Sequence, residues 1–212
     1  MERKELERLV EEVVRKHLED SLYVQVGVSN RHTHLKQEDV EMLFGKGYSL
    51  TKLKDLKQPG EFVAQETIVV EGPKESFPKV RILGPSRRLT QIELSLSDAR
   101  VLGITVPIRE SGHVEGSASV ILRGPNGSVT APVGAIAAHR HIHMPVAVAK
   151  AHGLENGSIV SVQTLGPRPL IFLEVMLRVS DRYALEMHVD VDEANAACLD
   201  NGDLVKIRKD KE

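Results

Sequence analysis

The chain has 212 residues, which fits one large domain or two small ones at about 150 residues per domain. Charged residues make up 27% and hydrophobic residues 41%, as in globular proteins and unlike disordered chains. The net charge of −2 gives no general attraction to nucleic acids or anionic membranes, and the single cysteine excludes an intrachain disulfide framework. No apolar run approaches the roughly 20 residues that span a bilayer. We therefore expect a soluble cytoplasmic protein without nucleic-acid or membrane partners.

Residues 1–20 are predicted to form an amphipathic helix. Apolar residues recur at spacings of three and four and make one stripe, while charged residues fill the other face. The stripe consists of Leu6, Leu9, Val10, Val13, Val14 and Leu18. A lone helix of this length is marginal in water, so the stripe needs a surface that covers it. That surface belongs either to the protein's own body or a second copy, or to a partner protein, and the pattern leaves both open.

From residue 22 onward, short β-branched or alternating runs are separated by turns that contain glycine, proline or asparagine. The runs predicted to be strands cover 22–28, 62–71, 79–83, 89–95, 118–123, 128–133, 158–164, 170–179, 183–189 and 204–208. Long amphipathic helices between the strands are missing, which argues against a doubly wound parallel sheet or an eightfold βα barrel. The sequence predicts a mainly β protein, built as barrels or sandwiches, with few and short helices.

An internal repeat occurs at four places in the chain. Each copy starts with a side chain that can bind a metal ion, continues with an apolar residue and runs into a short helix-like segment. The four starting residues are His34, Glu93, His143 and His188. Two copies carry a longer match, because Arg31-His32-Thr33-His34 resembles Arg140-His141-Ile142-His143. Duplicated barrels can contain repeats without any site, but three histidines and a glutamate are unusual as packing residues. We therefore interpret the repeat as a device that directs several ligands into one cleft.

Six side chains in these segments are candidate metal ligands. In an extended segment, residues two apart lie on one face, so each His-x-His pair can present both imidazoles to one metal ion or to neighbouring ions. The candidates are His32, His34, Glu93, His141, His143 and His188. Imidazole and carboxylate donors without a thiolate fit Zn²⁺, with Co²⁺ or Fe²⁺ as alternatives. A closed structural zinc site needs four ligands, so six indicate two metal ions with open positions, as catalysis requires.

Arg87 and Arg88 follow a Gly-Pro-Ser turn, just before the predicted strand that carries Glu93. A guanidinium near metal ligands can hold a phosphate or carboxylate through two hydrogen bonds, whereas the alternative is that both arginines are surface residues of a turn. Their positions alone do not choose between the two. Cys198, among alanines of a predicted helix, is expected to be a buried, small apolar residue.

Three motifs resemble, in their order along the chain, the signatures of the PduL-type phosphotransacylases, which are the phosphate propanoyltransferases of propanediol-utilising bacterial microcompartments. The motifs are Gly27-Val-Ser-Asn-Arg-His-Thr-His-Leu35, Leu83-Gly-Pro-Ser-Arg-Arg-Leu-Thr-Gln-Ile-Glu-Leu-Ser95 and Arg140-His-Ile-His-Met144. The resemblance runs from about Val24 to the C-terminus. It implies two β-barrels capped by short α-helices, the first from residues 21–30 and 139–212 and the second from residues 31–138.

The resemblance also implies a dinuclear zinc site between the barrels. The ligands of the first zinc ion carry over to His32, His34 and Glu93, and those of the second carry over to His141, His143 and His188. The family's phosphate-binding, catalytic arginine carries over to Arg87 rather than Arg88. Residues 1–20 would match the helix that directs some family members into a microcompartment, where shell or cargo proteins would be its partners. We further expect a homo-oligomer.

The implied reaction converts an acyl-CoA, with a propanoyl or acetyl group, and phosphate into an acyl phosphate and coenzyme A, reversibly. Phosphate held by zinc and Arg87 would attack the thioester directly, without an acyl-enzyme. A first alternative is a metal-dependent hydrolase of the amidohydrolase type, for which Asp190 is the candidate catalytic aspartate. A second alternative is a non-catalytic metal-binding module of a shell or scaffold.

Overall fold

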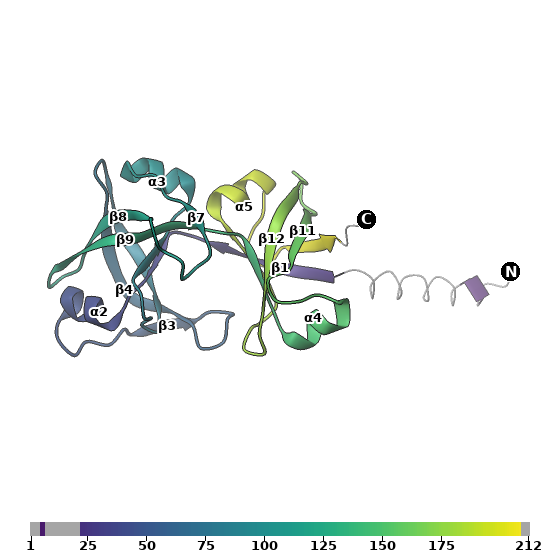
Figure 1. Ribbon diagram of the computed structural model, residues 1–212, viewed down its shortest axis with the longest axis horizontal. Coiled ribbons are helices and arrows are strands. Elements are labelled where there is room, and N and C mark those ends of the chain that lie inside the picture. The colour runs from purple at the N-terminus through teal and green to yellow at the C-terminus, as the bar shows by residue number, and fades with distance from the viewer. Residues whose placement is uncertain (1–4, 7–21, 209–212) are drawn as a thin grey trace.

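In the computed structural model, which describes residues 5–6 and 22–208, the described strands close into two barrels that lie side by side (Figure 1). The first barrel consists of β1 (Leu22–Ser29), β10 (His141–Met144), β11 (Ile159–Thr164), β12 (Ile171–Val179), β13 (Glu186–Asp190) and β14 (Leu204–Arg208). Its strand order is β1-β13-β10-β12-β11-β14, and β14 pairs with β1 to close the ring. The first barrel is therefore discontinuous in sequence, because the second barrel is inserted after β1.

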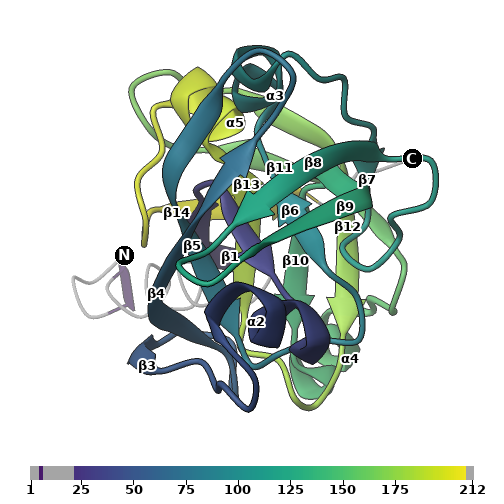
Figure 2. The same cartoon turned by 90° about the vertical axis from the view of Figure 1, so that its left-hand side faces the viewer.

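The second barrel faces the viewer in Figure 2. It consists of β2 (His32–His34), β4 (Phe62–Glu71), β5 (Ser76–Gly84), β6 (Gln91–Glu93), β8 (Ala118–Arg123) and β9 (Ser128–Ala138). These strands follow the order β4-β5-β2-β6-β9, and β8 closes the ring because it pairs with both β9 and β4. Two short strands extend the edges: β3 (Lys52–Asp55) pairs with β4, and β7 (Ile108–Arg109) pairs with β9.

Short helices follow the strands that carry the candidate ligands. They are α2 (Gln37–Phe44) after β2, α3 (Leu96–Leu102) after β6, α4 (Val146–His152) after β10 and α5 (Val191–Ala197) after β13. Side-chain caps begin two of them: the Ser95 hydroxyl accepts from the Asp98 amide, and Asp190 and Glu193 form a reciprocal capping box. The repeated unit of the sequence is thus a strand, a candidate ligand near its end and a short helix.

Each barrel has its own apolar core, because inward-facing residues alternate with outward-facing ones along the strands. Leu122 of β8 is fully buried in the core of the second barrel, whereas Leu53 of β3 is 54% exposed. We expect Leu122→Ala to lower the free energy of unfolding by about 2–5 kcal/mol, because it removes packed methyl groups and leaves a cavity. Urea denaturation measures the change, with Leu53→Ala as a control that should cost far less. Equal costs for the two variants would contradict this account of the core.

The predicted mainly β fold with two barrels and short helices is confirmed. The predicted helix over residues 1–20 lies outside the described residues except at residues 5 and 6. The division into domains 21–30 with 139–212 and 31–138 stays a prediction. The expectation for Cys198 is wrong: it ends α5 in a left-handed conformation with φ 52°, and its side chain is exposed. Among the described residues, no helix has the length and apolarity to cross a membrane.

Candidate active site

The structure gathers the six candidate ligands into two clusters. His32, His34 and Glu93 form the first cluster, and His141, His143 and His188 form the second; within each, one donor atom per residue lies within 4.8 Å of the others. Strand pairing produces both arrangements, because β2 is antiparallel to β6 and places His32 opposite Glu93, while β10 is antiparallel to β13 and places His141 opposite His188. Each His-x-His pair therefore meets its third member across one pair of neighbouring strands.

The two clusters are supported in the same way. Arg31, just before His32, donates from Nη2 to Asp98 Oδ1 at 2.7 Å, and Arg140, just before His141, donates from Nη1 to Glu193 Oε1 at 2.7 Å. Asp98 and Glu193 occupy equivalent positions near the starts of α3 and α5. Each guanidinium also lies over a phenylalanine ring, 4.2 Å from that of Phe77 and 5.7 Å from that of Phe172. These contacts hold in place the backbone just before the first histidine of each His-x-His pair.

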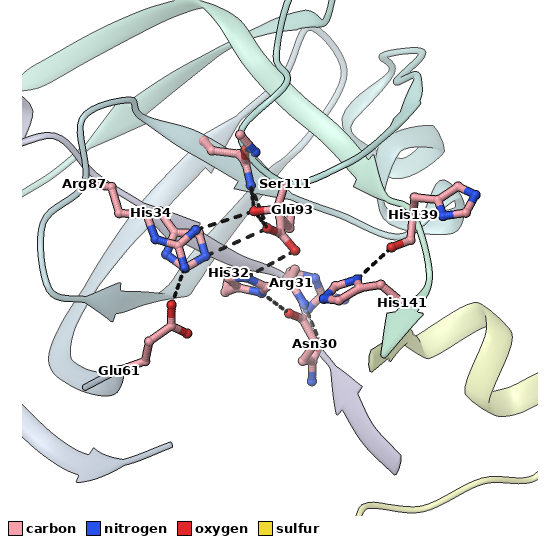
Figure 3. Close-up of polar contacts among 12 residues, drawn as sticks. Asn30, Arg31, His32, His34, Glu61, Arg87, Glu93, Ser111, His139 and His141 are labelled. Atoms are coloured by element: carbon pink, nitrogen blue, oxygen red, sulfur yellow. Dashed lines mark hydrogen bonds and ion pairs between the residues drawn. The ribbon is translucent and has the colours of Figure 1, made fainter. Parts of the chain in front are cut away.

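In the first cluster, a hydrogen bond turns a lone pair of His32 toward a buried carboxylate. His32 Nδ1 lies 2.8 Å from the carbonyl oxygen of Asn30, to which it can only donate, so the neutral ring presents its Nε2 lone pair. That Nε2 lies 3.5 Å from Glu93 Oε2, and His34 Nε2 lies 3.8 Å from Glu93 Oε1 (Figure 3). A cation between the facing acceptors would satisfy them.

The charge of Glu93 is held in place by its neighbours. Burial raises the pKa of this carboxyl, but the facing imidazoles of His32 and His34 and a hydrogen bond from Ser111 outweigh burial and bring the pKa to about 2. Ser111 Oγ donates to Glu93 Oε1 at 3.0 Å, and Gln91 Nε2 donates to the same oxygen at 2.6 Å. Glu93 is therefore ionised at neutral pH, as a metal ligand must be.

In the second cluster, the imidazoles of His141 and His143 are buried and neutral. His141 Nδ1 lies 2.8 Å from the carbonyl oxygen of His139, which repeats the contact of His32, and His141 Nε2 lies 3.1 Å from His143 Nε2. Burial, reinforced by His188, lowers the pKa of His141 to about 4. Burial and His141 lower the pKa of His143 to about 2, and its Nδ1 has no hydrogen-bond partner. Neutral imidazoles with unsatisfied nitrogens suit a divalent metal ion.

These histidines make the stability of the chelator-treated protein depend on pH. The folded pKa of His141, about 4, lies below its ordinary value of 6.5, so between these values the unfolded chain binds a proton that the folded protein does not. Stability therefore falls as the pH falls through this window, by about 3 kcal/mol for this one residue. Urea denaturation at a series of pH values should show a shallower fall for His141→Gln than for the unchanged protein. His113→Gln, at an exposed position, is the control, and equal slopes for all three would contradict the assignment.

Arg87 lies beside the first cluster, whereas Arg88 is exposed. The Arg87 guanidinium donates from Nη2 to Glu61 Oε1 at 2.6 Å, and its Nη1 lies 3.5 Å from Ser111 Oγ. The same Ser111 hydroxyl donates to Glu93, so Arg87 is linked to the candidate metal ligands through one side chain (Figure 3). The structure thus separates two arginines that were equivalent in the sequence.

Both clusters open into one pocket between the barrels. Its lining includes His32 and Glu93 from the second barrel and His141 and His188 from the first. His139 also lines the pocket, but its ring points away from the histidine clusters, and its backbone carbonyl makes the contact to His141 (Figure 3). Residues of both candidate metal clusters therefore line one pocket.

Sequence reasoning missed several polar residues around these clusters. They include Gln58, Glu61, Gln91, Ser111 and Glu186. Gln91 and Glu186 had a usable signal, because each stands two residues before a candidate ligand and so shares its face of a strand. The other three lie in loops, whose approach to the site is fixed by tertiary structure and has no periodic pattern in the sequence.

Comparisons with known proteins all point to one family. The model of the phosphate propanoyltransferase family matches residues 25–200. A protein of Thermotoga maritima with the name phosphate propanoyltransferase is 51% identical over 183 residues, which cover 86% of this chain and 87% of the relative. Proteins of the same name from Rhodopseudomonas palustris and Enterococcus faecalis are 50% and 47% identical, and cover 90% and 93% of this chain and 84% and 94% of the relatives.

Proposed function

This chain belongs to the phosphate propanoyltransferase family, and from this we propose that it transfers an acyl group reversibly between coenzyme A and inorganic phosphate. The substrates are an acyl-CoA and phosphate, and the products are an acyl phosphate and free coenzyme A. Propanoyl is the acyl group in the relatives' name, and acetyl is the second that we propose. The observation that supports this most directly is one pocket lined by two metal-ligand clusters, with a guanidinium beside the first.

The donor set fits two zinc ions, because imidazole nitrogens and carboxylate oxygens face one another with too few hydrogen-bond donors between them. A cation would satisfy these lone pairs. We assign one ion to His32, His34 and Glu93, and the other to His141, His143 and His188. Zinc bound there would supply Lewis-acid polarisation of the thioester carbonyl. Backbone carbonyls at Asn30 and His139 accept from the first histidine of each pair and so fix which ring nitrogen is free to bind.

Arg87 is the proposed phosphate-binding and catalytic residue. Its guanidinium now holds the Glu61 carboxylate, and phosphate would take that place through two charge-assisted hydrogen bonds. Phosphate held in this way loses part of its hydration and gains a fixed line of approach to the thioester carbon. A phosphate oxygen then bonds to that carbon, the carbon–sulfur bond breaks, and coenzyme A leaves as the thiolate. Phosphate is itself the nucleophile, so no acyl-enzyme forms.

The two earlier alternatives lose their support. The amidohydrolase alternative needs a larger parallel barrel, whereas the barrels here have six strands each and many antiparallel pairs. Its candidate aspartate, Asp190, accepts a hydrogen bond from the Glu193 amide at 2.9 Å and serves as the cap of α5. The non-catalytic alternative disagrees with relatives that are named as enzymes over most of this chain.

We further propose a cytoplasmic homo-oligomer in which residues 1–20 direct the enzyme into a bacterial microcompartment through shell or cargo proteins. The apolar stripe of the predicted helix supports this, since it needs a surface to cover it. Deletion of residues 1–20 should leave acyl transfer unchanged and abolish co-purification with microcompartments.

The decisive test combines metal analysis with a phosphate-dependence assay on the full chain. The protein is incubated with propanoyl-CoA or acetyl-CoA, and a thiol reagent measures the release of coenzyme A. We expect two zinc ions per chain and thiol release that requires phosphate. Thiol release at the same rate without phosphate would indicate hydrolysis and overturn the proposal.

A further inference from the structure

Glu186 contacts a candidate metal ligand without belonging to either cluster. It stands two residues before His188 on β13, so both side chains lie on the same face of the strand. His188 Nε2 lies 2.8 Å from Glu186 Oε2, and the side chains of the two residues are 24% and 12% exposed. A carboxylate can only accept here, so the imidazole donates from Nε2, which leaves Nδ1 as the nitrogen that can present a lone pair to a metal ion.

The ring of His188 is oriented so that this lone pair lies toward the other histidines. A Cβ atom built on Gly27 of β1 would lie 3.3 Å from His188 Cδ2, which places this edge of the ring on the β1 side. Nδ1 is on the opposite edge of an imidazole, and the strand on the opposite side of β13 is β10, which carries His141 and His143. The hydrogen bond to Glu186 therefore directs the free nitrogen toward the second cluster.

Two residues of the second barrel hold Glu186 in place. The Gln58 amide is 5% exposed and pairs with the backbone of Ala184: its Nε2 donates to the carbonyl oxygen, and its Oε1 accepts from the amide, both at 3.2 Å. The same Nε2 also lies 3.2 Å from Glu186 Oε2, and Lys57 Nζ lies 3.8 Å from Glu186 Oε1. The loop between β3 and β4 thus reaches across to the first barrel.

The space around Glu186 is closely fitted. A Cβ atom on Gly27 would approach both Cδ and Oε1 of Glu186 to 3.1 Å, closer than ordinary packing. The carboxylate is therefore confined beside His188, which is how carboxylates orient metal-binding histidines and increase their basicity.

We propose that Glu186 is a positioning residue that fixes the tautomer and ring orientation of His188 for metal binding, and that Gln58 and Lys57 of the opposite barrel hold it there. This rests on the proposed function only in taking His188 as a metal ligand. The loop that carries Gln58 also carries Glu61, the partner of Arg87. One loop therefore contacts both Glu186, beside the second cluster, and the proposed phosphate-binding arginine.

The test measures zinc affinity instead of activity. The full chain is loaded with zinc and titrated with a chromophoric chelator, which resolves tightly and weakly held ions. We expect Glu186→Ala to lower the affinity for one of the two zinc ions by about 10–100-fold and to leave the affinity for the other unchanged. Glu186→Gln keeps an oxygen acceptor, so its affinity for that ion should lie between those of the wild type and Glu186→Ala. Gln58→Ala should lower the affinity for the same ion by a smaller factor. His188→Ala identifies which ion is affected.

Glu71→Gln is the matched control, because this carboxylate pairs with Arg123 on the outside of the second barrel. The proposal would be overturned if a folded Glu186→Ala protein bound both zinc ions with wild-type affinity. It would also be overturned if the His188→Ala protein bound zinc as the wild type does. If Glu186→Ala does not fold, the same comparison is made with Glu186→Gln. A wild-type chain that binds both ions but transfers no acyl group would refute the proposed function and leave the role of Glu186 standing.

Discussion

Arg87→Ala should reduce kcat/KM for phosphate by on the order of 100-fold, or about 3 kcal/mol, because it removes charge-assisted hydrogen bonds to a desolvated anion. Arg87→Lys should recover only part of this loss, since an ammonium keeps the charge but lacks the paired N–H donors. Initial rates of thiol release, measured over a range of phosphate concentrations, separate a weaker KM from a lower kcat. The effect on the acyl-CoA KM should be small.

The neighbouring arginine provides the control for this experiment. Arg88 has the same charge and the next place in the chain, but it is exposed, so Arg88→Ala should keep wild-type kinetics. Thermal unfolding of each variant shows whether the loss of the ion pair with Glu61 affects the fold. Normal phosphate kinetics in Arg87→Ala, or an equal loss in Arg88→Ala, would show that phosphate binds elsewhere.

Glu93→Gln should lower the zinc content from two ions per chain to one and reduce acyl transfer by at least about 100-fold. The substitution keeps the shape of the side chain but removes the negative charge that faces His32 and His34. Ser111 would then donate to a neutral amide oxygen, so the polar contacts around residue 93 need not be lost. Metal analysis after dialysis and the phosphate-dependent thiol assay measure the two effects separately.

Glu75→Gln, at an exposed position before β5, is the control and should change neither quantity. Two tightly bound zinc ions in Glu93→Gln would remove this residue from the metal site. Full zinc loss together with unfolding would instead indicate that the first cluster holds the second barrel together, and thermal denaturation with and without zinc tests this directly.

The candidate ligands could be predicted from sequence because they stand at repeated positions. Period-two spacing places His32 with His34 and His141 with His143, and the repeat indicates that Glu93 and His188 are equivalent. Which strands pair is a property of the whole barrel, so the meeting of β2 with β6 and of β10 with β13 was not readable from local pattern. The residues around the ligands were missed for the same reason, since Glu61 and Ser111 approach from loops with no periodicity.

The pattern of residues predicted barrels as a class but not their connectivity, which was expected from the family resemblance alone. Apolar alternation and turn residues predicted most of the long strands, and the predicted run 89–95 contains β6. The strands β2, β3 and β10 are shorter than the runs that pattern analysis detects. Cys198 shows a second limit. A run of alanines predicted a continuing helix, but the chain leaves α5 there in a left-handed conformation that exposes the thiol.

The insertion of one barrel within the other sets an order for assembly during synthesis. β1 pairs with β13 and β14, so Leu22 cannot pair until its partner Ile207 has been synthesised. The strands β2 to β9 can associate as soon as residue 138 has left the ribosome. The nascent chain would therefore complete the second barrel while β1 still lacked both neighbouring strands. The unpaired edges of β1 could then pair with wrong strands. Because His32, His34 and Glu93 all belong to the early barrel, a metal ion captured there could stabilise the half-made enzyme until the remaining strands arrive.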